Sequence, residues 1–232
     1  MLVITSCTGK KCADTSRRLV LNDFLDQARL LRRKKELASF ACKATDLYTG
    51  DQHVYVTNAI QSLRERYGQT VVTLNIISAG YGLLSENDEV VPYESTFSGM
   101  SPKEIDKLSA YLNLPDKVRS EVMNHSLVIF LLGDRYLRGI KIPLEPAPHQ
   151  KFIFLAASSN EEVLKRSGST VVRAGLQETR LYGSGLVGLK GKIFELFAKG
   201  LVVKGAKAFT LLQRDPSPKA FLDLVRIGKK IQ

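Results

Sequence analysis

The feature that most constrains the fold is a series of short apolar segments that alternate with amphipathic ones. Five segments are rich in β-branched and aromatic side chains, as expected for strands buried on both faces of a parallel sheet: residues 2–5, 71–77, 127–132, 152–156 and 170–173. Between them, apolar side chains recur at three- and four-residue steps, notably in residues 56–67 and 193–201, which predicts helices packed on a sheet. No repeat or low-complexity linker divides the chain. We therefore expect one α/β domain over residues 1–232, three-layered and Rossmann-like, with a largely parallel central sheet.

Two further helices have start signals of their own. Ser101 is a capping residue, Pro102 suits the first helical position, and Glu104 completes a capping box at the third. The chain then restarts at Leu114-Pro115-Asp116, which predicts a second helix.

Candidate functional residues follow the predicted strands. In an open parallel sheet, ligands bind outside the carboxyl ends of the strands. Four polar segments are expected to converge there: residues 6–11, 78–94, 133–136 and 182–192.

The first segment, Ser6-Cys7-Thr8-Gly9-Lys10-Lys11, combines small polar residues with two lysines. Free backbone N–H groups and lysine charge suit a phosphate. The spaced glycines of a nucleotide-binding P-loop are missing, so that class of site is excluded. An ordinary polar turn is the alternative.

The second segment, residues 78–94, carries the acids that we consider first for catalysis. A carboxylate in a partly apolar loop can stabilise a developing cation or orient water, and Asp88 is the first choice, with Glu89 and Glu94 as substitutes. Each acid could instead hold a turn or cap a helix. Tyr81 and Tyr93 could stack on a base or simply pack in the core.

The last two segments offer an acid and an anion site. Asp134 follows the third predicted strand, next to Tyr136. The glycine-rich stretch from Tyr182 to Gly188 leads into a helix with Lys190 and Lys192 near its start, an arrangement that suits an anion.

The net charge favours a polyanionic partner. The chain has 34 basic and 23 acidic side chains, a net charge of +11, and nucleic acid is the leading candidate. Basic residues concentrate in residues 29–35, which include Arg32 and Arg33, and in the acid-free stretch 196–214. The two stretches could form surfaces that follow a phosphate backbone. For residues 29–35, a helix face that is merely solvated is an equal alternative.

The sequence disfavours a membrane protein, a secreted protein and a metalloprotein. No apolar run is long enough to span a bilayer and the amino terminus does not resemble a signal peptide, so we expect a cytoplasmic protein without a membrane partner. Cys7, Cys12 and Cys42 fit reduced thiols in that compartment. We expect no metal and no cofactor, a zinc site built from these thiols and a histidine being the alternative.

Four motifs carry a resemblance to known proteins: ITSCTGKKC (4–12), ATDLYTG (44–50), ISAGYGLL (77–84) and NDEVVPYESTF (87–97). Together they resemble a bacterial domain family found near phage-related and DNA-modification loci. The motif ISAGYGLL, with the Pro-Tyr pair that follows it, is also similar to segments of the peroxide stress-resistance family and, more distantly, resembles uracil-DNA-glycosylase-like domains. The likeness covers about the first hundred residues. The chain lacks the water-activating loop and the His-Pro-Ser segment of uracil-DNA glycosylases, which points away from uracil as the base.

The resemblance implies a uracil-DNA-glycosylase-like fold and a DNA glycosylase that removes a modified base and leaves an abasic site. Phage defence against DNA with glucosylated hydroxymethylcytosine is one specific form of that function. A carboxylate would stabilise the oxocarbenium-like sugar, and side chains around the base would hold it after flipping. For such a reaction, the residues that we predict for base or sugar binding are Cys7, Thr8, Tyr48, Ser78, Tyr81, Tyr93 and Asp134. Those that we predict for DNA phosphates are Lys10, Lys11, Lys190, Lys192, Arg32 and Arg33. An N-glycosidase or base-transferring enzyme for free nucleosides or nucleotides, and a non-catalytic DNA-binding or damage-protection protein, are the alternatives.

Overall fold

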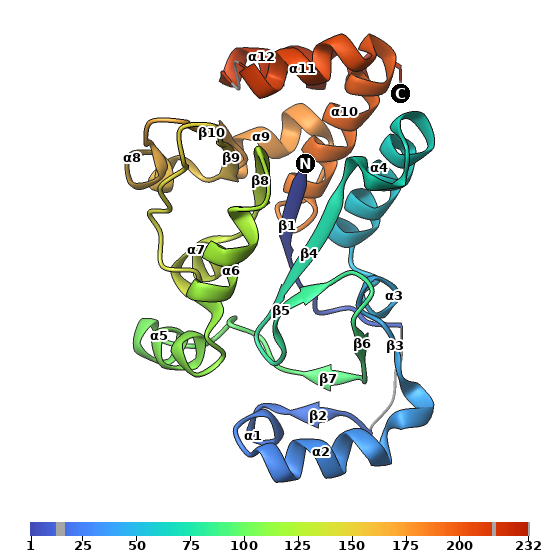
Figure 1. The fold of residues 1–232 in the computed structure, drawn as a ribbon, viewed down its shortest axis with the longest axis vertical. Helices are drawn as coiled ribbons and strands as arrows, with labels where there is room; N and C mark the ends of the chain where they lie inside the picture. The colour runs from blue at the N-terminus through green and yellow to red at the C-terminus, as the bar shows by residue number, and fades with distance from the viewer. Residues whose placement is uncertain (13–16, 215–216, 232) are drawn as a thin grey trace.

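A six-stranded sheet forms the centre of the computed structural model, which describes residues 1–12, 17–214 and 217–231. Its strands lie in the order β10-β9-β8-β1-β4-β5 (Figure 1). The strands are β1 (Leu2–Ser6), β4 (Thr73–Ser78), β5 (Gly82–Ser85), β8 (Leu127–Leu131), β9 (Lys151–Ala156) and β10 (Ser169–Arg173). The five strands expected from the sequence are all present and all mutually parallel, which confirms an α/β fold with a mostly parallel sheet.

The strand order defines where a ligand would bind. Numbered along the chain, the five parallel strands lie in the order 2-1-3-4-5, because β1 pairs with β4 on one side and with β8 on the other. The direction of winding therefore reverses between β1 and β8. In doubly wound sheets, the crevice at the carboxyl ends of such a strand pair is the usual ligand site.

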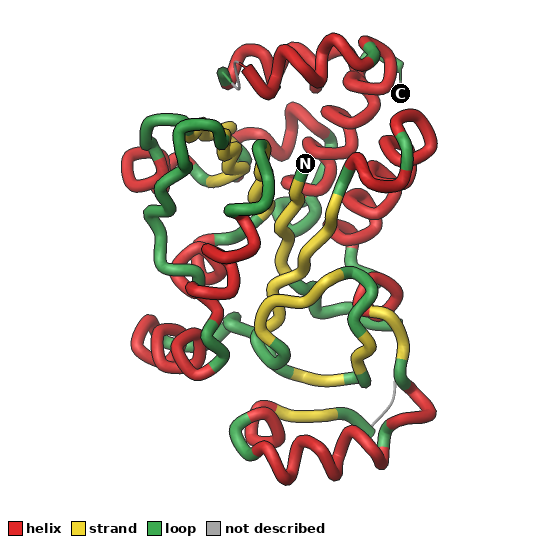
Figure 2. The backbone as a smooth tube through the Cα atoms, in the orientation of Figure 1, coloured by secondary structure: helices red, strands yellow, loops and turns green. Residues whose placement is uncertain are grey.

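Helices cover both faces of the sheet (Figure 2). They are α1 (Leu21–Phe24), α2 (Gln27–Glu36), α3 (Ala44–Leu47), α4 (Asp51–Tyr67), α5 (Pro102–Tyr111), α6 (Leu114–Val122), α7 (Asp134–Gly139), α8 (Glu161–Leu164), α9 (Leu176–Tyr182), α10 (Leu189–Lys204), α11 (Ala206–Arg214) and α12 (Pro218–Lys229), with 3-10 turns at Ala38–Phe40, Gln69–Val71 and Ser158–Asn160. The capping box at Ser101 is present, and Pro115 lies in the first turn of α6, as predicted.

Alternate residues of each strand pack into two separate cores. Val3 and Ile129 point toward α4, α10 and α12, whereas Ile4 and Phe130 point toward α5, α6 and α7. Because every central strand is buried on both faces, continuous apolar runs rather than alternating ones specify it.

The segment from Ser78 to Glu94, expected to be a loop, instead contains an antiparallel edge strand. Gly82 has φ +81°, a conformation that favours glycine, and the chain reverses there so that β5 runs back along β4 with Ser85 opposite Asn75. Two short pairs follow: β6 (Glu89–Val90) with β3 (Cys42–Lys43), and β7 (Tyr93–Glu94) with β2 (Leu19–Val20). The reversal carries the middle of this segment away from the carboxyl edge.

Helices α4 and α10 run side by side in the same direction. At their starts, a Cβ on Gly191 would lie 2.5 Å from the carbonyl oxygen of Gln52, so only glycine permits this approach. Near their ends, the Tyr67 hydroxyl donates to the carbonyl of Leu201 at 2.7 Å. Gln52, in the first turn of α4, hydrogen-bonds to Thr5 and Leu131 near the carboxyl ends of β1 and β8. Both helices therefore start at the carboxyl edge of the sheet, and both direct free N–H groups toward it.

Protonation of His53, at the start of α4, is expected to destabilise the fold. The ring is 2% exposed, its Nε2–H donates to the Thr45 carbonyl at 2.7 Å, and Nδ1 has no partner among the described residues. Burial holds the pKa of His53 below its ordinary value of 6.5, so below that pH the unfolded chain binds more protons than the folded one. The free energy of unfolding should therefore fall on acidification, by up to about 1.4 kcal/mol per pH unit. Urea unfolding of wild type and His53→Gln at pH 7.5 and 5.5 measures this: a loss equal in both proteins would contradict it.

Candidate functional site

A hollow of about 460 Å³ opens at the carboxyl ends of β1 and β8, the reversal point of the sheet. We call it the β1–β8 hollow. It is lined by Ser6, Gln52, Ser98, Gly133, Asp134, Arg135, Tyr136, Ala157, Ala174, Gly175, Leu176, Leu186, Val187 and Lys190. Most of these residues lie at or just after the carboxyl ends of β1, β8, β9 and β10 or in the first turns of α4, α7, α9 and α10, so the topology brings them together from distant parts of the sequence.

Gln52 fixes the floor of this hollow. Its amide nitrogen donates to the Thr5 hydroxyl at 2.9 Å and to the Leu131 carbonyl at 3.0 Å, and it lies 3.4 Å from the Ser6 hydroxyl. The side chain is 6% exposed and joins the ends of β1 and β8, the two strands that flank the reversal point. Gln52 therefore links the two strands by hydrogen bonds at the floor of the hollow.

Besides Arg135, which donates to backbone carbonyls, Lys190 in the first turn of α10 supplies positive charge to the hollow. It makes no hydrogen bond or ion pair with any other described residue. Burial lowers the pKa of its ammonium group, and the Asp134 carboxylate opposes that shift. A half-buried lysine without a close partner is costly for stability and can interact with a ligand's negative charge or react as an amine.

Asp134 supplies the negative charge, at the start of α7 immediately after β8. Its Oδ1 accepts a hydrogen bond from the Asn160 amide at 2.8 Å, which orients the carboxylate. The residue is solvent-accessible and lines two adjoining hollows, so a ligand in either one can reach it.

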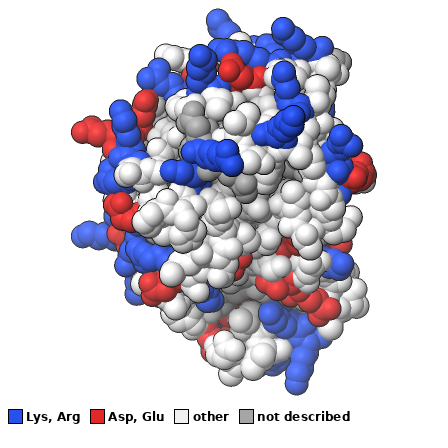
Figure 3. All heavy atoms as spheres, turned by 45° about the horizontal axis from the view of Figure 1, so that its top comes forward, with Lys and Arg blue, Asp and Glu red and all other residues white. Residues whose placement is uncertain are grey.

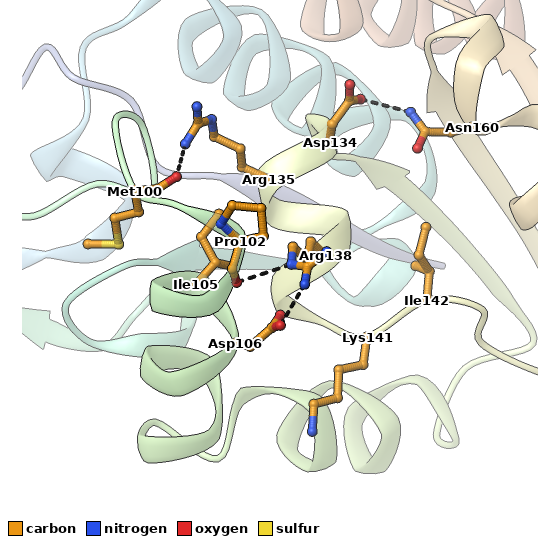
Figure 4. Close-up of a pocket in the computed structure, with 10 residues that line it drawn as sticks. All are labelled: Met100, Pro102, Ile105, Asp106, Asp134, Arg135, Arg138, Lys141, Ile142 and Asn160. Atoms are coloured by element: carbon orange, nitrogen blue, oxygen red, sulfur yellow. Dashed lines mark hydrogen bonds and ion pairs between the residues drawn. The ribbon is translucent and has the colours of Figure 1, made fainter.

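The second of these, the Asp106 hollow, has a volume of about 610 Å³ and lies between α5, α7 and Asn160 (Figure 4). Its arginines are already engaged. Arg138 pairs with Asp106 at 2.6 Å and donates to the Pro102 carbonyl, and Arg135 donates to the Phe97 and Met100 carbonyls. This hollow is therefore a polar extension of the β1–β8 hollow, with which it shares Asp134 and Arg135.

Three predicted base-binding residues form a buried hydrogen-bonded cluster. The Tyr48 and Tyr93 hydroxyls lie 2.8 Å apart, and Ser78 donates to Tyr93 at 2.8 Å while accepting the N–H groups of Gly80 and Tyr81. Tyr48 is 3% exposed and Tyr93 1%, and burial raises the pKa of both phenols. Neither ring has a face free to stack on a base in this conformation, so the cluster supports the carboxyl end of β4.

The remaining predicted base- or sugar-binding residues also have internal partners. The Cys7 thiol lies 3.1 Å from the Tyr136 hydroxyl, beside the β1–β8 hollow. The Tyr81 hydroxyl donates to the Val91 carbonyl and accepts its N–H, both at 3.1 Å. The Thr8 hydroxyl accepts the Gly50 N–H at 3.3 Å and donates to the Lys10 carbonyl. Of the whole predicted set, only Asp134 lines the β1–β8 hollow.

The three acids predicted for catalysis lie outside the β1–β8 hollow. Asp88 is exposed in the turn after β5, where its carboxylate accepts the Ser85 N–H at 2.9 Å. Glu89 is exposed on β6, and Glu94 pairs with Arg18 at 3.3 Å. The structure thus brings none of them to the reversal point of the sheet, because β5 returns the chain along β4 before Asp88 is reached.

The predicted phosphate-binding residues divide into three groups. Lys190 lines the β1–β8 hollow, whereas Lys10 and Lys11 line a third hollow of about 360 Å³ with Gly9, Arg18, Thr49, Pro92, Tyr93 and Glu94. We call it the Lys10 hollow. Lys192 pairs with Glu195 at 2.9 Å, with both side chains 12% exposed, and Arg32 and Arg33 both pair with Glu36 on α2. The internal ion pairs offset the charge of this last group.

The basic stretch 196–214 lies far from these hollows. It covers the second half of α10 and all of α11, at the amino-terminal edge of the sheet, because Leu201 packs beside the end of α4. Figure 3 brings this end forward and shows Lys and Arg side chains gathered along it. The two predicted basic surfaces therefore lie at opposite ends of the molecule (Figure 1).

Gln52 is the site residue that the sequence analysis missed, and Ser6 and Tyr136 had no role assigned to them. A signal for Gln52 exists, since it continues the apolar stripe of Val56, Ile60 and Leu63 at helical spacing. A polar residue on a buried helical stripe must find hydrogen-bond partners in the interior.

Among the described residues, no three His, Cys, Asp or Glu side chains are grouped as metal ligands would be, and no helix is long and apolar enough to cross a membrane.

Comparison with known proteins gives one match. The profile of a family described as "Family of unknown function (DUF6884)" matches residues 32–166, more than half of the chain. The matched region contains the start of α4, β8 and Asp134 but ends before Lys190. No curated protein and no solved structure matches the chain.

Proposed function

The chain belongs to the DUF6884 family, whose function is unknown, and on the geometry of the β1–β8 hollow we propose that it is a DNA glycosylase that cleaves the bond between a modified base and its sugar. The observation that carries this proposal is that an accessible carboxylate, Asp134, and a lysine without a hydrogen bond or ion pair to another described residue, Lys190, line one hollow at the reversal point of a parallel sheet. The motif resemblance to uracil-DNA-glycosylase-like domains supports the same reaction.

The chemistry of the bond assigns a role to each charge. Departure of the base develops positive charge on the sugar and negative charge on the base. The Asp134 carboxylate, oriented by Asn160, would stabilise the sugar cation and position the attacking water. The Lys190 ammonium would stabilise and protonate the departing base. Burial favours that proton transfer because it lowers the pKa of Lys190.

The Asp106 hollow supports a modified base as the substrate. It opens beside the β1–β8 hollow and adds about 610 Å³ of space, in which charged and polar side chains such as Asp106, Arg138 and Lys141 lie among apolar ones. A base that carries a bulky hydrophilic substituent, such as glucosylated hydroxymethylcytosine, could extend its substituent into it. An unmodified base would leave that space to water.

Two observations support DNA rather than a free nucleotide. The net charge of +11 exceeds what one nucleotide requires. The Lys10 hollow is also close to the β1–β8 hollow along the chain, since Lys10 is four positions after Ser6, at most about 14 Å of extended backbone. A flanking phosphate of a polynucleotide bound at Asp134 could therefore reach the two lysines.

The double variant Lys10→Ala/Lys11→Ala is expected to weaken the salt dependence of DNA binding. Each phosphate contact contributes about 0.7 (single strand) to 0.9 (duplex) to the slope of log Kobs against log salt concentration, so the slope should fall by roughly 1.4–1.8. Fluorescence anisotropy with labelled oligonucleotides between 50 and 200 mM salt measures it. The matched control, Lys204→Ala/Lys207→Ala, removes two lysines at the opposite end and should leave the slope unchanged; equal losses in both double variants would mean that binding is not directed to the Lys10 hollow.

The proposed activity is tested by incubation with natural and hypermodified phage DNAs, glucosylated hydroxymethylcytosine DNA among them. Mass spectrometry scores released bases, and alkaline cleavage scores abasic sites. Release from one DNA establishes a glycosylase and names its base. Release from free nucleosides or nucleotides alone would shift the substrate class, and salt-dependent binding with no release would favour a non-catalytic DNA-binding protein.

A further inference from the structure

Lys190 is placed to do more than hold a negative charge. Its amine lines the same hollow as Asp134, and no described carboxylate lies within ion-pair distance to keep it engaged. The neighbouring lysine of the same helix differs in this respect, since Lys192 pairs with Glu195 and lies 5.0 Å from the centre of the Tyr55 ring. One lysine at the start of α10 is thus neutralised and covered, and the other is available to a ligand.

The backbone around Lys190 holds it in place. Gly188 and Gly191 pack tightly against the start of α4: a Cβ on Gly188 would lie 3.1 Å from Asp51, and one on Gly191 would lie 2.5 Å from the Gln52 carbonyl. The helix turn that carries Lys190 is therefore fixed against the residue that joins β1 and β8. A reactive amine on a rigid element is the arrangement that covalent catalysis by lysine requires.

We propose that Lys190 gives the protein a second activity, cleavage of the DNA strand at the abasic site through an imine between its side-chain nitrogen and C1′ of the sugar. This inference rests on the proposed function, since it assumes that a deoxyribose occupies the β1–β8 hollow. After Lys190 has given its proton to the departing base, its amine is neutral and faces C1′.

The steps balance without an oxidant or reductant. In the ring-opened abasic sugar, the Lys190 nitrogen bonds to C1′, and the aldehyde oxygen leaves as water to form the imine. The imine acidifies C2′, whose proton passes to the Asp134 carboxylate. The C3′–O bond then breaks, and the 3′ phosphate takes the electron pair. Water adds to C1′, releases the unsaturated aldehyde and regenerates the amine.

The test uses the full chain and a synthetic duplex with one abasic site, prepared by enzymatic removal of uracil. Sodium borohydride reduces an imine to a stable amine, so wild type and Lys192→Ala should give a covalent protein–DNA adduct, mapped by mass spectrometry to Lys190. Lys190→Ala and Lys190→Arg should give at least about 100-fold less. Lys190→Arg keeps the charge, so its binding to abasic DNA should stay within a few-fold of wild type; thermal melting checks that each variant is folded.

The outcomes separate this inference from the proposed function. Because the abasic site is supplied, an adduct can form even if no base is released from any DNA, which would reject the glycosylase and keep the lysine chemistry. Base release without any adduct would reject the imine and keep the glycosylase. An adduct that persists in Lys190→Ala, or maps to another amine, would also overturn the assignment.

Discussion

Asp134→Asn is expected to lower base release by about 10²–10⁴-fold while DNA affinity changes little. Asparagine keeps the size of the side chain and can still interact with Asn160, but it carries no negative charge to stabilise the sugar cation and cannot accept a proton. Asp134 is accessible and exposed at the start of α7, so the substitution removes no buried contact. Single-turnover assays on the DNA identified by the substrate panel would measure the rate, and anisotropy the affinity.

Asp88→Asn is the matched control for that experiment. Asp88 was the first choice from the sequence, and its carboxylate accepts the Ser85 N–H in an exposed turn. Asparagine can make the same hydrogen bond, so the fold should be unaffected and base release should stay within about two-fold of wild type. Loss of activity in Asp88→Asn with full activity in Asp134→Asn would return catalysis to the segment after β4 and reject the β1–β8 hollow as the active site.

Structural features that depend on residues close together in the sequence could be predicted from it. The five parallel strands are apolar runs of β-branched and aromatic residues, and Asp134 could be predicted as a site residue because it directly follows one of them. The pairing of Lys192 with Glu195 could also have been predicted, since residues three apart on a helix are neighbours. Lys192 was predicted to bind phosphate because its charge was considered without that of its helical neighbours.

Features that depend on distant segments could not be predicted. The return of β5 along β4 depends on the conformation of Gly82, and glycine alone does not say whether a loop or a hairpin follows. The burial of Tyr48 against Tyr93 depends on packing between β7 and the segment after α3. Lys190 and Asp134 are 56 positions apart in sequence and meet because the reversal point lies between β1 and β8.

The contact between α10 and α12 is expected to tolerate no side chain at its closest point. A Cβ on Gly200 would lie 1.9 Å from the Leu224 carbonyl oxygen, and one on Gly228 would lie 1.9 Å from that of Leu196. Both neighbours are helix backbone, which cannot move aside as a flexible side chain can. Because α12 covers the core through Phe221, which stacks on Phe197 of α10 at 4.4 Å between ring centres, separating the helices also disturbs buried aromatic packing.

Gly200→Ala should therefore destabilise the protein by about 2 kcal/mol and lower the melting temperature by roughly 4–8 °C. Intrinsic helix propensity predicts the opposite sign, a gain of about 1 kcal/mol for alanine, so the direction of the shift alone distinguishes the two effects. Gly185→Ala is the control, because its Cβ would meet no atom within 4 Å. The double variant Gly200→Ala/Gly228→Ala should lose less free energy of unfolding than the sum of the two single losses. The reason is that one separation of α10 from α12 removes both steric clashes. A Gly200→Ala protein that melts at or above the wild-type temperature would show that α10 and α12 can separate without cost.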